Sequence, residues 1–80
     1  MVKKIVRLKT KELMKAQIDL SIASDSDLAS KIGVSTTQVW RVKLSPKDKR
    51  YNTPGNHFIA GVMNTFGGPF ERFFYLDDTQ

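Results

Sequence analysis

Apolar residues recur with helical spacing along much of this chain. The segment 11–20 predicts a first helix with Thr10 as its N-cap, and two apolar rows run along it. One row holds Leu13, Ala16, Leu20 and Ala23, and the other holds Met14, Ile18 and Ile22. An apolar face this broad predicts cover on two sides, for instance from the core and from the C-terminal segment.

The middle of the chain predicts two short helices joined by a tight turn. Ser24 and Asp27 have the spacing of a capping box, and Ser35 and Gln38 repeat it. Gly33 lies between the two boxes, where it is free to take the left-handed conformation that ends a helix. The inward positions of the two helices are Leu28, Ala29, Ile32, Val39 and Val42.

The second half of the chain predicts a loop and then the main core helix. The polar, proline-containing stretch 45–52 is typical of a loop. Thr53 followed by Pro54 predicts a helix start, because proline loses no hydrogen bond at the first helical position. The apolar residues of that helix are Phe58, Ile59, Val62, Met63 and Phe66. Gly67 and Gly68 should end it, and Pro69 can begin a short further helix.

Both ends of the chain favour strands. The segments 2–8 and 73–76 are rich in strand-forming residues, so we expect them to pair as a small sheet supported by the helices. The alternative for 2–8 is a frayed basic arm, and the alternative for 73–76 is a dimer contact. We expect the last residues, 77–80, to be disordered.

Length and composition predict one mainly α-helical domain. Eighty residues, 1–80, allow a single core of about four or five helices. The absence of cysteine excludes disulfides and thiolate metal sites and suits a reducing cytoplasm. No apolar run approaches the roughly 20 residues of a membrane helix, and the N-terminal run is too short for a signal peptide. We therefore expect a cytoplasmic location.

The charge distribution indicates an anionic partner. Thirteen Lys and Arg against 8 Asp and Glu give a net charge of +5, with a pI near 9.8. The basic residues gather in two groups, namely Lys3, Lys4, Arg7, Lys9, Lys11 and Lys15, and Arg41, Lys43, Lys47, Lys49 and Arg50. Such segregation predicts a positive face. A positive face alone also suits RNA, lipid or an acidic protein.

The sequence offers little for catalysis. His57 is the single histidine, and Asp25 and Asp27 are two residues apart, so they face different sides of a helix. No spacing typical of metal ligands is present. We expect no enzyme activity, no metal, no cofactor and no small-molecule ligand.

The run L-A-x-x-I-G-V-S at 28–35, with a capping box on each side, resembles the helix-turn-helix of the phage-repressor and Cro (XRE-like) family. In that family the second helix lies in the DNA major groove. The resemblance implies a lambda-repressor-like domain with its helix-turn-helix core at 24–44. The alternative is two ordinary amphipathic helices of a small bundle. The spacing from Leu13 to Leu28 is about one turn longer than usual in the family, which predicts a longer first helix or a longer loop before Ser24.

The second helix of the core should present side chains to DNA. The expected base contacts are Thr36, Thr37, Gln38, Trp40 and Arg41, and the expected phosphate contacts are Ser24, Ser26, Ser35, Lys43, Lys47, Lys49 and Arg50. Gln38 either contacts a base or completes the capping box with Ser35. Trp40 either packs on DNA or folds back on the loop near Tyr51. Asp25 either turns away as part of the cap or leaves the phosphate to Ser24 and Ser26.

These observations predict a sequence-specific regulator of transcription that binds double-stranded DNA. The resemblance implies a small phage or mobile-element repressor, associated with DNA in a bacterial cell. Two copies on a palindromic operator are expected, because one helix contacts only a few base pairs. The alternative is a protein that binds as a monomer. The alternatives are a recombination-directionality or architectural DNA-binding factor, and a protein-binding antirepressor module.

Overall fold

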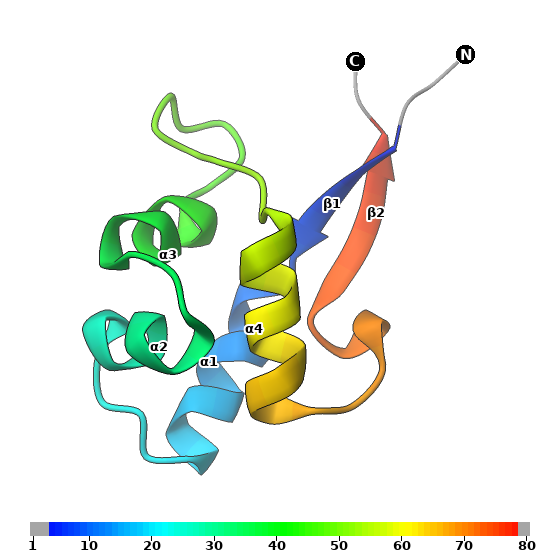
Figure 1. Ribbon diagram of the computed structural model, residues 1–80. Helices are drawn as coiled ribbons and strands as arrows, with labels where there is room; N and C mark the ends of the chain where they lie inside the picture. Colours follow the sequence, from blue (N-terminus) through cyan, green and yellow to red (C-terminus); the bar gives the residue numbers. More distant parts are fainter. Residues whose placement is uncertain (1–3, 79–80) are drawn as a thin grey trace.

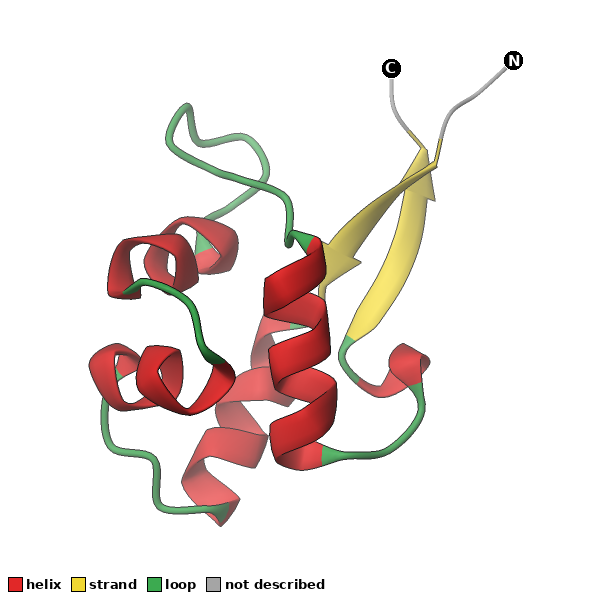
Figure 2. Cartoon of the chain, in the orientation of Figure 1, coloured by secondary structure: helices red, strands yellow, loops and turns green. Residues whose placement is uncertain are grey.

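A computed structural model describes residues 4–78 of the protein (Figure 1). In chain order the elements are β1 (Lys4–Leu8), α1 (Thr10–Asp19), α2 (Asp25–Ile32), α3 (Thr36–Lys43), α4 (Asn56–Phe66), the 3₁₀ helix η1 (Phe70–Arg72) and β2 (Phe74–Asp78). The described part is mainly helical, with one small sheet that projects from the helices (Figure 2). The predicted mainly α-helical fold with a small two-stranded sheet is therefore confirmed.

The sheet joins the two ends of the described chain. Strands β1 and β2 pair antiparallel, with a register that runs from Leu8 opposite Phe74 to Lys4 opposite Asp78. This confirms the predicted pairing of the terminal segments; positions 2 and 3 of the first lie outside the described residues. Both Leu8 and Phe74 are buried, so the sheet is anchored at the end that meets the helices.

The prediction of disorder after Leu76 was wrong for two residues. Asp77 and Asp78 belong to β2, and residues 79–80 lie outside the described part. The Lys4 ammonium pairs with the Asp78 carboxylate, and Arg7 Nε donates to Asp77 Oδ2 at 3.3 Å. Cross-strand pairs of opposite charge stabilise a ladder, and this extends the strand beyond its apolar residues.

Helix α4 occupies the middle of the core. In Figure 1 it runs between the α2–α3 pair and the sheet. Phe58 and Val62 of α4 are fully buried, and the Phe58 ring meets Phe74 edge-on with 6.4 Å between centroids. The Phe66 ring is tilted by 50° to the Phe73 ring, with 5.5 Å between the centroids. Among the described helices none is long and apolar enough to cross a membrane.

The start of α4 differs from the prediction. The helix begins at Asn56 with Gly55 as its N-cap, so Thr53 and Pro54 precede it. Pro54 is buried instead, and the Gly55 carbonyl accepts the first helical bond from the Ile59 amide at 3.0 Å. The end is as predicted, because α4 stops before Gly67, whose φ is 72°.

Helix α1 also differs from the prediction in its cap and its cover. It begins at Thr10, and the N-cap residue is Lys9, whose amide donates to the Phe73 carbonyl. Leu13 and Ala16 are buried as expected, but the helix ends at Asp19 and a loop fills the long spacing before Ser24.

The second apolar row of α1 is only partly covered. The exposed fractions are 51% for Met14 and 76% for Ile18, whereas Ile22 is buried. Leu20, at the end of the first row, is also 53% exposed. The C-terminal segment pairs with β1 rather than lying over this row, and Ser21 turns the chain at φ 57° directly after Leu20. The expectation of cover on two sides was therefore wrong.

The two central helices form as predicted. The Ser24 hydroxyl accepts a hydrogen bond from the Asp27 amide, and the Ser35 hydroxyl accepts one from the Gln38 amide, each at 3.1 Å. Gly33 ends α2 in the left-handed region, with φ 80°. Helix α3 is thereby held at a fixed angle to α2 by a turn of three residues, 33–35.

Candidate nucleic-acid interface

The outward face of α3 gathers most of the expected base contacts. Val39 and Val42 are buried against the core, which leaves the opposite side of this helix in water. Four of the expected residues are exposed there, namely Thr36, Thr37, Trp40 and Arg41. Positions i, i+1, i+4 and i+5 of a helix share one side, so these four side chains form a continuous surface.

Gln38 lies at the border of this surface. Its backbone amide completes the cap by donating to Ser35 Oγ, and its side chain is half-buried, with Nε2 beside Gly55. The side chain therefore faces the N-terminus of α4 more than the outward side of α3. Of the five expected base contacts, it is the one least exposed to a ligand in the groove.

Trp40 is both exposed and in contact with the following loop. Its exposed fraction is 40%, and the Arg50 guanidinium lies over the indole, 4.9 Å from the ring centroid. Tyr51, the expected neighbour, instead holds the Arg7 guanidinium over its ring at 5.2 Å. The cation–π contact joins the loop to the outward face of α3.

Arg50 is held in place by Asp48. The guanidinium donates from Nε to Oδ1 at 3.1 Å and from Nη2 to Oδ2 at 3.0 Å, a bidentate pair. These hydrogen bonds lower the pKa of the Asp48 carboxyl, because they stabilise its charged form. The other edge of the guanidinium, with Nη1, keeps donors for a further acceptor.

Arg50→Gln is expected to raise the pKa of Asp48 toward its ordinary value. The substitution removes the cation and the two side-chain hydrogen bonds that hold the carboxylate ionised. A carbon-13 NMR titration of the Asp48 carboxyl measures the shift. Arg41→Gln is the matched control and should leave the Asp48 pKa unchanged; an equal change in both variants would contradict this account of the pair.

Lys43 was expected to face the solvent, but it does not. Its Nζ donates to Asp25 Oδ1 and to Gln17 Oε1, both at 2.6 Å, and its side chain is 15% exposed. Asp25 therefore turns toward α3, which answers the question left open for that carboxylate. Sequence analysis missed Gln17; the available signal was its position on α1, four residues after the buried Leu13.

The other expected phosphate contacts lie at the surface. Exposed side chains are Ser24, Ser26, Ser35, Lys47, Lys49 and Arg50. The two capping hydroxyls accept hydrogen bonds in the protein and each keeps its own O–H donor. Neither Lys47 nor Lys49 forms an ion pair with another described residue. The loop thus carries two lysines available to a polyanion beside α3.

Groups that could bind a metal ion are not assembled in residues 4–78. No three residues among His, Cys, Asp and Glu lie close enough there to hold a metal ion, and His57 is exposed. In comparisons with known proteins, no family model matches the chain, and neither a curated protein nor a solved structure matches it.

Proposed function

We propose that this protein is a sequence-specific regulator that binds double-stranded DNA through α3. The observation that carries the proposal is the outward face of α3, where Thr36, Thr37, Trp40 and Arg41 are exposed. The loop that follows α3 adds the exposed Lys47 and Lys49. A helix with one buried and one exposed side, preceded by a tightly turned helix, has the shape that enters a major groove.

The side chains of this face suit the edges of base pairs. Arg41 can donate two hydrogen bonds to guanine, and the threonines can offer a hydroxyl or touch a thymine methyl. Trp40 can pack on sugar and methyl groups while Arg50 remains stacked on it. The amide-rich start of α3, which Ser35 caps, can meet a phosphate, because this end of the helix carries a partial positive charge.

The wider role follows from the resemblance to phage-repressor and Cro proteins. We place the protein in the bacterial cytoplasm as a small phage or mobile-element repressor that occludes polymerase at its operator. Two copies on a palindromic site would double the length of DNA contacted, since a single α3 spans only a few base pairs.

A second candidate function has one observation in its favour. Met14, Ile18 and Leu20 expose a large apolar area on α1 and the loop after it. Apolar patches of this kind occur at protein–protein interfaces, so an antirepressor that binds another protein is the competing proposal. An antirepressor would show no preference among duplexes.

Selection from a pool of random duplexes tests the proposal. A DNA-binding regulator should enrich a defined motif, and a symmetric motif would also indicate two bound copies. The enriched duplex should bind at least roughly a thousandfold more tightly than random duplexes at physiological salt. Recovery of no motif, at low as well as physiological salt, would refute the proposed function.

Lys49→Ala is expected to weaken binding to every duplex alike. A lysine that neutralises a phosphate releases a counterion, so its loss should lower the slope of log affinity against log salt by about 1. Binding isotherms at several salt concentrations measure this slope. Lys4→Ala is the control, because that ammonium pairs with Asp78 in the projecting sheet (Figure 1). A sequence-dependent loss in Lys49→Ala would contradict the assignment.

A further inference from the structure

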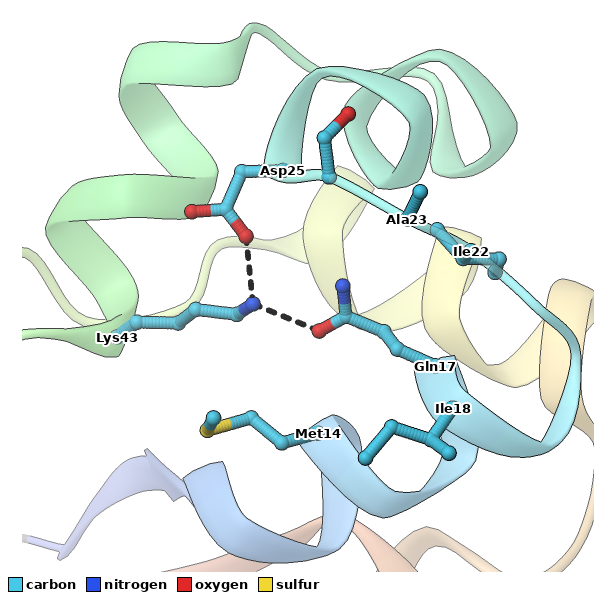
Figure 3. Close-up of a pocket in the computed structure, with 8 residues that line it drawn as sticks. Met14, Gln17, Ile18, Ile22, Ala23, Asp25 and Lys43 are labelled. Carbon is cyan, nitrogen blue, oxygen red and sulfur yellow. Dashed lines mark hydrogen bonds and ion pairs between the residues drawn. The ribbon is translucent and has the colours of Figure 1, made fainter.

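The ammonium of Lys43 joins three helices at one point. Lys43 is the last residue of α3, Asp25 is the first residue of α2, and Gln17 lies in α1. Figure 3 shows the Lys43 ammonium between the Asp25 carboxylate and the Gln17 amide oxygen, with both hydrogen bonds drawn. We call these three side chains the Lys43 network.

The Lys43 network is short, charged and largely shielded from water. Both hydrogen bonds measure 2.6 Å, and the Lys43 and Asp25 side chains are 15% and 35% exposed. Within residues 4–78, Gln17 is the one buried residue with a polar side chain. An open pocket of about 390 Å³ borders the network, with Met14, Ile18 and Ile22 on its apolar side. Hydrogen bonds to charged groups in such surroundings are stronger than those between neutral groups.

The Lys43 network supplies directional contacts that the buried valines of α3 do not. Val39 and Val42 hold α3 against the core through apolar burial, which depends little on direction. A charge-assisted hydrogen bond at the last residue of the helix constrains rotation about the helix axis and movement along it. Arg41 lies two residues before Lys43, so a rotation that broke the network would also move Arg41.

We propose that Lys43 is a positioning residue, which fixes the orientation of α3 through Asp25 and Gln17 and thereby sets the base preference of the protein. This inference rests on the proposed function, since base preference exists only if α3 contacts DNA. It replaces the sequence-based assignment of Lys43 to a phosphate. A lysine with two partners inside the protein contributes orientation, whereas a phosphate contact contributes affinity for any duplex.

Asp25→Asn distinguishes a positioning role from a purely electrostatic one, because the two predict different effects on DNA binding. The substitution keeps the shape of the side chain and removes a negative charge, so electrostatics alone predicts tighter binding to every duplex. The positioning role predicts instead that the ratio of selected-site affinity to random-duplex affinity falls by roughly tenfold, as for the loss of one base contact. Lys43→Met should give the same fall in this ratio, with the salt slope unchanged.

Asp27→Asn is the matched control. Asp27 is exposed, lies in the same first turn of α2, and its side chain has no hydrogen bond or ion pair with another described residue. The Asp27→Asn substitution removes the same charge without changing the Lys43 network. The ratio of selected-site affinity to random-duplex affinity should therefore equal that of the unaltered protein. Exchanging the two charged residues in Asp25→Lys with Lys43→Asp should restore part of the ratio lost in the single variants.

Amide hydrogen exchange tests the positioning role without DNA. In Asp25→Asn and Lys43→Met, the amides of α3 should exchange faster, while those of α4 keep their protection. Unchanged exchange in α3 would overturn the inference, and so would an unchanged affinity ratio or a salt slope lowered by about 1 in Lys43→Met. If the unaltered protein selects no duplex, the proposed function fails, and with it any role in base preference. The exchange rates would still show whether the network orders α3.

Discussion

Gly61→Ala is expected to lower the free energy of unfolding by about 2 to 3 kcal/mol, although alanine favours helices over glycine by about 1 kcal/mol. Gly61 lies in the middle of α4 where that helix meets the end of α2. A Cβ there would lie 2.1 Å from the Ile32 carbonyl oxygen and 2.7 Å from its Cβ. Since the obstacle includes backbone, the two helices must move apart.

Thermal unfolding followed by circular dichroism measures this effect. A loss of 2 to 3 kcal/mol corresponds to a Tm lower by roughly 10 to 20 °C in a domain of this size. Gly61→Val should leave little folded protein. Gly55→Ala is the control: its φ is −88°, and the nearest atom to an added Cβ is Gln38 Nε2 at 3.8 Å, so only a loss of about 1 kcal/mol or less from the poorer N-cap is expected. A Tm raised by Gly61→Ala would contradict the close approach of α2 and α4.

Arg41→Ala is expected to weaken the preference for the selected duplex strongly. Arg41 is exposed on the outward face of α3, and a bidentate contact to guanine discriminates against other bases by about 1 to 3 kcal/mol. Affinity for the selected duplex should therefore fall by roughly 10- to 100-fold, toward that for random duplexes. Fluorescence anisotropy with the two duplexes measures the difference.

Arg72→Ala is the matched control for this substitution. Arg72 is an exposed arginine of η1 that stacks on Phe73 at 4.7 Å and lies outside α2 and α3. It removes the same charge from the protein, so it should leave the preferred sequence unchanged. If Arg41→Ala kept that preference at full strength, our assignment of α3 to the bases would be wrong.

The elements that sequence analysis predicted well are those set by local interactions. Ser24 and Ser35 cap helices through amides three residues away, and Gly33 ends a helix through its own φ. Such contacts depend on short spacing, which is visible in the chain. The pairing of the terminal strands was also predicted, because both segments carry strand-forming residues and an isolated strand is not stable.

The features that were missed depend on partners distant in the chain. Lys43 binds Gln17 across 26 residues, and no local pattern distinguishes this lysine from the exposed Lys47. Asp77 continues β2 opposite Ile5, and it accepts a hydrogen bond from Arg7, 70 residues away in the chain. Pro54 looked like a helix start, but tertiary packing buries it and moves the start to Asn56.

The exposed face of α3 was predictable from the sequence, but the contact of this face with the following loop was not. Thr36, Thr37 and Arg41 face the solvent since the valines of α3 face the core. The contact between Trp40 and Arg50 depends on the conformation of the loop, which the bidentate pair with Asp48 fixes. That loop conformation has no signature at sequence level beyond its polar composition.

An NMR titration of the protein with the selected duplex tests the central claim most directly. Our account predicts that the largest changes in amide and side-chain signals fall on Thr36, Thr37, Trp40 and Arg41. Smaller changes should follow at 47–50, while η1 and the sheet stay unchanged. Perturbations centred on the sheet, on η1 or on the exposed row of α1, with the α3 signals unmoved, would contradict it.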